Sequence, residues 1–253
     1  AGVVGSNGGT PETRAVVDAA DVVIFVGCRA GSVTTERWRH PAPGKAKIIH
    51  IDVDPAVPGA NYKVDVPLIG GAELTLGALN EVVSASSRDR GYVNSRKDEK
   101  CTNFEALAAA EDSPIKPERV VAELQRALDK DAIVVADPGT PCPYFSAFYL
   151  VRGTGRRYFS NRAHGALGYS MAAAMGAHFA RPSLKCVSVM GDGSFGFTCG
   201  ELETAARYRL PITFIVVANA TYGWIKAGQR FGFGERYFPA DFAVTDHAAV
   251  AAA

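Results

Sequence analysis

The sequence predicts an α/β protein with two Rossmann-like domains, each built on a parallel sheet. Short apolar runs that stop at Gly, Asp or Asn alternate with segments whose apolar residues recur at helical spacing, as in proteins built from βαβ units. Residues 186–219 show this most plainly: they read strand, helix, strand, a unit that is almost always a crossover between parallel strands. A polar stretch at 86–114, expected to be a linker, separates residues 1–85 from residues 115–253.

The composition is typical of a globular protein and excludes several classes of function. Of the 253 residues, 47% are hydrophobic and 21% are charged, and the formal net charge is +1. This charge gives no reason to expect a nucleic-acid or membrane-surface partner, and no apolar run approaches the roughly 18–20 residues of a membrane span. The five cysteines are widely spaced without a C-x-x-C pair, so we expect reduced thiols in a cytoplasmic protein and no zinc site.

The first domain, residues 1–85, is expected to hold three strands and two helices. Residues 21–26 form an apolar run that ends at Gly27, which is typical of a buried parallel strand. The other expected elements are a short helix at 15–20, strands at 47–54 and 64–66, and a helix at 71–83. The pattern G-x-G-x-x-G is missing, so this domain has no dinucleotide fingerprint.

The second domain, residues 115–253, follows a linker whose mixed charges can bury little surface and whose middle, 104–110, is expected to be a short helix. Pro117 suits the first turn of a helix that continues to Leu128. Strands are expected at 131–136, 186–190 and 212–218. An alanine-rich helix is expected after 170, and a helix with Leu202, Ala205, Ala206 and the stem of Arg207 on one side before 211.

Two oxygen-bearing side chains follow neighbouring strands of this domain. Asp192 stands in the turn Gly191-Asp192-Gly193, and Asn219 ends the next strand. Parallel strands end at the same edge of a sheet, where open α/β sheets bind ligands, and oxygen ligands suit Mg²⁺ shared with a phosphate group. Gly193 and Ser194 would let backbone N–H groups approach an anion. The residues thus indicate a magnesium–diphosphate site, with an ordinary tight turn as the alternative.

The spacing of these residues resembles the motif of thiamine-diphosphate-dependent enzymes, which begins with Gly-Asp-Gly and ends in Asn, here 27 positions after Asp192. The resemblance implies thiamine diphosphate and Mg²⁺ as cofactors, with Mg²⁺ bound by Asp192, Asn219 and the main-chain carbonyl of Thr221. The family often has two consecutive Asn at this point. Ala218 replaces the first, but the ligand position is the second, so the metal site is expected to be intact.

The same resemblance assigns further residues to the cofactor. In the family, a large apolar side chain before the alanine-rich helix lies under the cofactor and forces its two rings into a V. By position this is Leu167, and the carbonyl of Gly165 would hold the amino group, with a tightly packed helix as the alternative. Gly139 and Thr140 match a strand-end loop that helps to hold the diphosphate, although an ordinary turn explains them nearly as well. The expected cofactor-binding set is Gly139, Thr140, Gly165, Leu167, Gly191, Asp192, Gly193, Ser194, Asn219, Thr221 and Tyr222.

Three residues are candidates for the substrate side. His164 is near Leu167 in sequence, and histidine is a residue type suited to proton transfer, so it could act catalytically as a proton donor; a structural hydrogen bond is the alternative. Trp224 and Ile225 match a region that lines the substrate pocket in relatives, with core packing as the alternative.

The first domain resembles the central domain of the same enzymes, through the loop Gly27-Cys28-Arg29 and the strand that contains His50, Asp52 and Asp54. Some relatives bind FAD or an ADP moiety there and many bind nothing, and a purely structural domain is the favoured interpretation. His50 is expected to be a packed histidine, and the two aspartates are expected to form a turn rather than a metal pair.

The resemblance is closest to the acetohydroxyacid synthase and benzoylformate decarboxylase group. It implies a lyase or transferase that decarboxylates a 2-oxo acid or joins it to a second carbonyl compound, as acetolactate synthase does, in a homodimer or homotetramer. The family's N-terminal pyrimidine-binding domain, with its activating Glu, has no counterpart in the sequence, so we expect a fragment that is inactive by itself.

Two other functions compete with this interpretation. The chain could be a non-catalytic nucleotide- or diphosphate-binding module of the same fold, although such a module has no chemical reason to keep all three metal positions. An FAD- or NAD-dependent oxidoreductase is disfavoured by the missing G-x-G-x-x-G.

Overall fold

The computed structural model describes residues 2–87, 89–162 and 164–253 and divides into two compact units, Ala1–Ala109 and Ala110–Ala253. Both are α/β units with parallel sheets, so the expected fold class is confirmed. Among the residues described, no helix combines the length and the apolar character that a membrane span requires.

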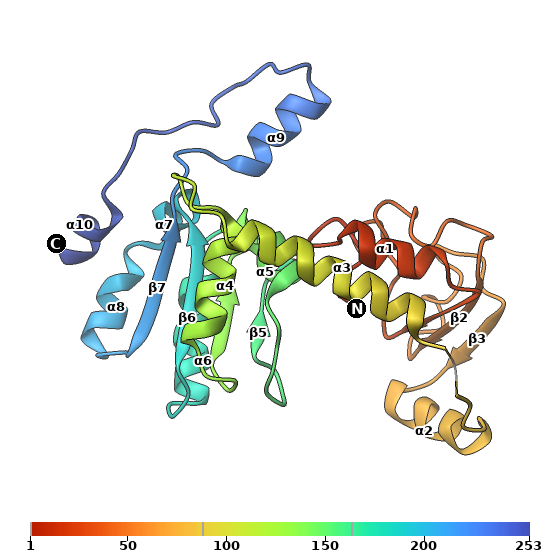
Figure 1. The fold of residues 1–253 in the computed structure, drawn as a ribbon. Coiled ribbons are helices and arrows are strands. Elements are labelled where there is room, and N and C mark those ends of the chain that lie inside the picture. The colour runs from red at the N-terminus through yellow and green to blue at the C-terminus, as the bar shows by residue number, and fades with distance from the viewer. Residues whose placement is uncertain (1, 88, 163) are drawn as a thin grey trace. The chain divides into compact units, whose positions relative to one another are not determined.

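The first unit is built on a three-stranded parallel sheet in the order β1-β2-β3 (Figure 1). Phe25, His50 and Pro67 lie side by side across the sheet. The first helix begins after Thr10, whose hydroxyl accepts the N–H of Thr13. The elements are α1 Pro11–Asp18, β1 Val22–Val26, β2 Lys47–Asp52, β3 Val66–Ile69, α2 Ala72–Val82 and α3 Gly91–Ala108.

One face of β1 is open, which corrects the expectation of a buried strand. Val22, Ile24 and Val26 are 44%, 49% and 36% exposed, whereas Val23 and Phe25 on the other face are half-buried. The strand lies at the edge of its sheet, so it has a strand neighbour on one side only. An apolar run alone does not distinguish a strand covered on both faces from one covered on a single face.

Helix α3 occupies most of the stretch that was expected to be a linker. It packs against α1: the Asn103 amide donates to Glu12 Oε1 at 2.9 Å, and the Tyr92 hydroxyl donates to the carbonyl of Ala15 at 3.3 Å. The segment has little hydrophobic periodicity, so its helix depends on these tertiary contacts rather than on an amphipathic pattern. It belongs to the first unit, and the boundary falls after it.

The second unit has a four-stranded parallel sheet in the order β5-β4-β6-β7. Strands β4 and β6 are buried almost throughout, as their continuous apolar sequences predict. The elements are α4 Pro117–Ala127, β4 Ile133–Ala136, α5 Pro141–Phe148, β5 Tyr158–Phe159, α6 Tyr169–Ala180, β6 Cys186–Gly191, α7 Asp192–Thr198, α8 Glu201–Arg207, β7 Ile212–Val217, α9 Gly223–Gly232 and α10 His247–Ala252.

The helix expected between β6 and β7 is divided into α7 and α8 around Cys199 and Gly200. Leu202 and Ala205 face the core as expected, but Ala206 and Arg207 are exposed. All four residues belong to α8 itself, so the side of this helix that reaches the core is narrower than the spacing suggested.

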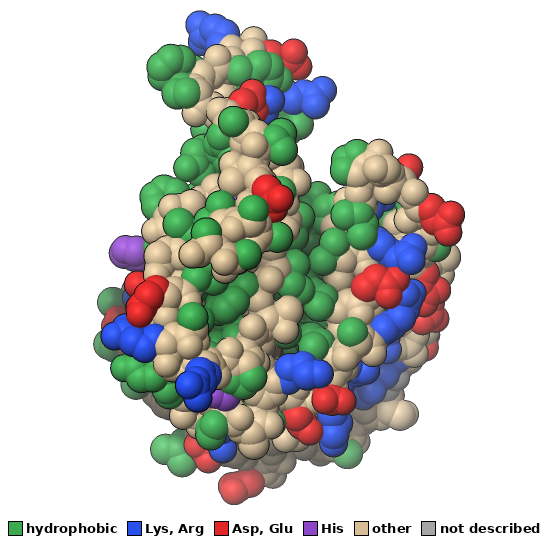
Figure 2. Space-filling model, turned by 90° about the vertical axis from the view of Figure 1, so that its left-hand side faces the viewer, with side chains coloured by type: hydrophobic (Ala, Val, Ile, Leu, Met, Phe, Trp, Pro, Cys, Tyr) green, Lys and Arg blue, Asp and Glu red, His purple; other side chains and the backbone are tan. Residues whose placement is uncertain are grey.

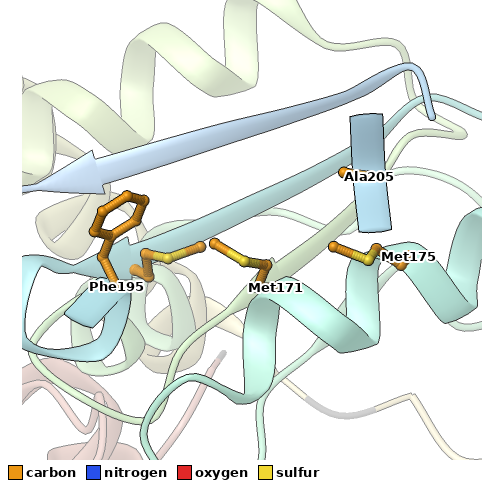
Figure 3. Packing of buried hydrophobic residues seen from close by; sticks show 5 residues of the cluster. Met171, Met175, Phe195 and Ala205 are labelled. Carbon is orange, nitrogen blue, oxygen red and sulfur yellow. The ribbon is translucent and has the colours of Figure 1, made fainter. Parts of the chain in front are cut away.

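A core of sulfur-containing and aromatic side chains fixes α6 and α7 against the sheet (Figure 3). Met171 and Met175 of α6 meet Met190 of β6, and Phe195 of α7 completes the cluster together with Ala205. Both Met171 and Met190 are fully buried. This packing holds α6 and the start of α7 against β6.

Candidate functional site

The candidate site lies where the strand order in the sheet of the second unit reverses, between β4 and β6. The chain runs from β4 to β5 on one side and from β6 to β7 on the other, so the loops after β4 and β6 diverge from adjacent strands. The crevice at the carboxyl ends of two such strands is the usual ligand position in open α/β sheets. The expected cofactor residues belong to the loops at this edge, to the turn before α6 and to the segment after β7.

Asp192 joins the ends of β6 and β7. It is 7% exposed, and its Oδ2 atom accepts the N–H groups of Asn219 and Ala220 at 2.8 and 2.6 Å. Its Oδ1 atom accepts the N–H of Gly193 at 2.8 Å. The structure therefore brings the Asp192 carboxylate to the backbone of Asn219, the residue whose 27-residue separation from it indicated a shared site.

The segment after β7 is held in a fixed turn. Asn219 Oδ1 accepts the N–H of Thr221 at 3.2 Å, which is an Asx turn. The Thr221 hydroxyl donates to the carbonyl of Ala240 at 2.9 Å, and the N–H of Tyr222 donates to the same carbonyl at 2.8 Å. Nearby, hydrogen bonds from Lys226 lower the pKa of Asp241, which pairs with Thr221 across an antiparallel bridge.

The chemistry of these groups fits a hard cation. A carboxylate has about four acceptor positions, and the three N–H bonds leave Asp192 able to offer an oxygen lone pair. The Asn219 amide oxygen likewise has a second lone pair, and Thr221 adds a carbonyl. Over the described parts of the chain, no group of three or more His, Cys, Asp or Glu could hold a metal. A metal at this edge would therefore combine the Asp192 carboxylate with amide and main-chain oxygens, a ligand set that suits Mg²⁺ rather than Zn²⁺.

The turn at the start of α7 offers main-chain groups rather than a side chain. The Ser194 hydroxyl donates to Asp137 at 2.7 Å, so its hydrogen already has an acceptor and an anion would be met by N–H groups. A Cβ added to Gly193 would lie 2.5 Å from Cε1 of Tyr222, which shows how closely this ring covers the turn. By contrast, a Cβ on Gly191 would meet nothing within 4 Å.

The loop after β4 and the turn before α6 meet at the same place. A Cβ on Gly139 would lie 3.5 Å from Cδ2 of Leu167 and 3.7 Å from the Ser194 hydroxyl. Thr140 reaches the other side of the site, since its hydroxyl lies 2.8 Å from the position of a Cβ on Gly223, near the Asn219 amide. Gly165 adopts φ +70° in the exposed turn before Leu167.

The substrate-side candidates are not gathered in the same way. His164 is exposed. Trp224 and Ile225 are 48% and 56% exposed on α9, which projects away from the sheet in Figure 1. Core packing therefore does not explain these two residues.

A cavity of about 780 Å³ adjoins the candidate metal residues and was not foreseen from the sequence. Asp192, Gly193 and Asn219 line one side of it, and aromatic and aliphatic side chains that include Phe195 and Phe242 line the other. The volume is within the range of small-molecule sites. Figure 2 views the face that carries α8 and α10, where hydrophobic side chains gather in the centre. The segment 242–250 shows no periodic pattern that could have predicted its place in the lining.

Asp137 is a second residue that sequence reasoning missed. It is fully buried at the end of β4, where its carboxylate accepts the Ser194 hydroxyl at 2.7 Å and the N–H groups of Gly168 and Ser170 at 3.3 and 3.1 Å. The signal in the sequence was an acidic residue directly after a wholly apolar strand, at the edge where ligands bind.

The expected roles in the first unit agree with its hydrogen bonds. The His50 ring bonds to the carbonyl of Cys28 at 2.8 Å and packs against Phe25, as expected for a packed histidine. Asp52 and Asp54 accept the N–H groups of Asp54 and Ala56, so they form successive turns.

Comparison with known proteins covers both units. Residues 137–253 match the C-terminal TPP-binding domain of thiamine pyrophosphate enzymes, and residues 1–79 match the central domain of the same enzymes. The chain is 32% identical to a probable acetolactate synthase large subunit of Methanococcus aeolicus, over 95% of this chain and 42% of that protein. It is 31% identical to the acetolactate synthase large subunit of Haemophilus influenzae, over 93% of this chain and 41% of that protein. The chain thus spans about two fifths of the length of these relatives.

Proposed function

This chain belongs to the thiamine pyrophosphate enzyme family, and we propose that it forms the central and cofactor-binding domains of a thiamine-diphosphate- and Mg²⁺-dependent enzyme. The proposed enzyme decarboxylates a 2-oxo acid or joins it to a second carbonyl compound, in the manner of the acetolactate synthases to which the chain is similar. The main support is the clamp between the Asp192 carboxylate and the N–H of Asn219 at the carboxyl edge of the sheet.

In this proposal, each part of the site has one task. Asp192, Asn219 and the carbonyl of Thr221 would hold Mg²⁺. The cofactor, when bound, supplies an electron sink for loss of carbon dioxide from the substrate. The chain's own contribution is to place its reactive rings and to hold its charge. The residues assigned to the diphosphate and the rings are Gly139, Thr140, Gly165, Leu167, Gly191, Gly193, Ser194 and Tyr222.

The rigidity of the metal turn supports this assignment. Asp192 is oriented by three N–H donors, and the turn that follows Asn219 is pinned to Ala240 by two hydrogen bonds. A ligand set that is already ordered loses little conformational entropy on binding a cation. The adjoining apolar cavity would keep water away from part of the site.

We further propose that the working enzyme contains more protein than these two domains. The proposed proton donor is His164, and the proposed walls of the substrate pocket are Trp224 and Ile225. All three residues are exposed, so a pocket that includes them needs further protein surface to enclose it. A homodimer or homotetramer, together with a domain that carries the activating Glu, would supply that surface, and the 253-residue chain by itself is expected to be inactive. The proposed location is the cytoplasm, where its five widely spaced cysteines would stay reduced.

A non-catalytic diphosphate-binding module is the second candidate. The observation that favours it is the contrast within the site: metal and diphosphate residues gather at one edge, whereas His164 and Trp224 are exposed. Such a module would bind thiamine diphosphate with Mg²⁺ and turn over no 2-oxo acid, even as the natural-length protein. Bound FAD or ADP in the first unit is not part of either proposal.

The first test is cofactor binding by the protein at its natural length. After removal of divalent ions, we expect thiamine diphosphate to bind only when Mg²⁺ is added, and Asp192→Asn to weaken this binding by about 100-fold, because a buried charged metal ligand is lost. Asp54→Asn is the matched control, since this aspartate also accepts an N–H in a turn but lies in the first unit. Thiamine diphosphate binding that is equally tight with and without Mg²⁺ would contradict the proposal. A screen of 2-oxo acids then distinguishes the two candidates, because the enzyme would convert at least one of them and the non-catalytic module would convert none.

A further inference from the structure

We propose that Asp137 is a positioning residue that sets the cofactor wedge, Leu167, and the diphosphate turn at Ser194 in their places relative to each other. This rests on the proposed function, since it gives a task to residues assigned there to the cofactor. Asp137 itself is assigned no contact with the cofactor or the substrate.

From the end of β4, the Asp137 carboxylate reaches both α7 and the start of α6. Asp137 ends β4, with its own N–H bound to the carbonyl of Val189 in β6 at 2.8 Å, so its backbone is part of the sheet. From this rigid point Oδ1 accepts the Ser194 hydroxyl in α7, and the two oxygens accept the N–H groups of Gly168 and Ser170 at the start of α6. One buried side chain therefore connects three segments that are far apart in sequence.

The connected segments carry residues that are assigned to the cofactor in the proposed function. Gly168 directly follows Leu167, adopts φ +88° and has no room for a side chain, because a Cβ there would lie 2.5 Å from Cγ2 of Thr198. The bond to its N–H therefore fixes the direction in which the chain leaves Leu167. Ser194 belongs to the diphosphate turn. The Leu167 tip and the Ser194 hydroxyl already lie 3.5 and 3.7 Å from a Cβ placed on Gly139, so a small displacement would change their fit.

Because Asp137 is fully buried, its hydrogen bonds are costly to lose. Hydrogen bonds to a carboxylate are stronger than those between neutral groups, and they strengthen further where water is excluded. Asp137 has no exposed surface, so solvent cannot replace a lost bond. In Asp137→Asn, an amide NH₂ group replaces one carboxylate oxygen. This group cannot accept a hydrogen bond, so at least one of the N–H and hydroxyl groups that now bond to Asp137 would lose its acceptor. The segments would then separate slightly while the fold persists.

The same network contains a matched control for a merely structural role. The Ser188 hydroxyl donates to Ser170 at 3.0 Å, and both residues are fully buried. This bond stabilises the same turn of α6 but does not connect it with α7. Ser188→Ala should therefore lower stability without changing how the wedge and the diphosphate turn are set.

The experiment compares Asp137→Asn with Ser188→Ala in the natural-length protein. Affinities for thiamine diphosphate and thiamine monophosphate are measured with Mg²⁺, together with the Tm of each cofactor-free protein. We expect Asp137→Asn to weaken thiamine diphosphate binding about 10–100-fold, as loss of outer-shell partners does at metal sites, and to reduce discrimination against the monophosphate. Ser188→Ala should lower Tm and leave both affinities within about twofold.

Three outcomes decide the matter. Equal effects of the two variants on discrimination would overturn the positioning role and leave a structural one. Wild-type protein that binds no thiamine diphosphate would overturn the proposed function and this inference with it. If Asp137→Asn does not fold, Ser194→Ala removes only the bond to α7, and undiminished discrimination in that variant would reject the inference.

Discussion

The carboxylate of Asp192 has a structural task in addition to its proposed role at the metal. Its hydrogen bonds to Asn219 and Ala220 clamp the end of β7 to the start of α7 with protein groups alone. A substitution of Asp192 therefore alters the turn as well as the metal ligand. For this reason the Mg²⁺ dependence of cofactor binding is more informative than the loss of binding in a single variant.

Close packing at Gly193 leads to a prediction at the same scale. Gly193→Ala places a methyl group 2.5 Å from Tyr222, in a ring pair that Tyr222 makes with Phe242. We expect the free energy of unfolding, measured in urea, to fall by about 1–3 kcal/mol, as overpacking usually costs.

Gly191→Ala is the control, because its Cβ meets nothing within 4 Å. This variant should change the free energy of unfolding by less than about 1 kcal/mol. Equal stability of Gly193→Ala and wild type would mean that Tyr222 does not cover the turn in solution.

At the scale of elements, the two-residue strand β5 depends on α5 for its position. Tyr158 of β5 shares a hydrogen bond with Ser146 of α5 at 3.0 Å, and its ring packs beside Tyr149. Burial, and secondarily the neighbouring Cys142, raise the pKa of Tyr158 above its ordinary value of 10.0. The folded protein therefore favours the neutral phenol.

The sign of the resulting pH dependence follows from this direction. Below pH 10 the Tyr158 phenol is neutral in the folded and in the unfolded protein, so its titration does not affect stability. Above pH 10 the unfolded chain loses the phenol proton before the folded protein does, so stability falls as pH rises. We expect Tyr158→Phe to remove part of this decline, which for one group is at most about 1.4 kcal/mol per pH unit. The free energy of unfolding in urea, measured between pH 9 and 11, shows this decline. Tyr208 is exposed, so the stability of Tyr208→Phe should fall with pH as that of the wild type does.

At the scale of the whole molecule, the chain consists of two units, and a short exposed segment follows the boundary between them in sequence. Residues 111–115 are exposed and outside any helix, whereas α3 is helical up to Ala108. A protease specific for acidic residues should therefore cut first at Glu111 or Asp112, because exposed irregular segments are the preferred sites of cleavage.

Mass spectrometry of the first fragments checks this expectation. Initial cleavage at Asp98 or Glu99 would instead show that α3 is not stably folded, and that the whole stretch 86–114 acts as the linker that its composition suggested.

The sequence predicted most of the strands and their common edge, because continuous apolar runs and a strand–helix–strand order restrict the topology strongly. It missed the two-residue strand β5, and it placed the third strand at 64–66 instead of Val66–Ile69. The meeting of Asp192 with Asn219 follows from that topology alone. The extent of α3 could not be predicted, since its helix depends on contacts with α1. The role of Asp137 was equally hidden, because its partners lie 31 to 57 positions away and nothing in the local sequence names them.

The methionine cluster has a practical consequence for experiments in solution. All three methionines of the chain, Met171, Met175 and Met190, belong to the one core beneath α7, and Met190 stands two positions before Asp192. A protein labelled only at its methionine methyl groups would, from this chain, give three NMR signals, all from a core that includes Phe195, which lines the cavity. Ligand addition could then be followed from inside the fold, without a probe at the site itself.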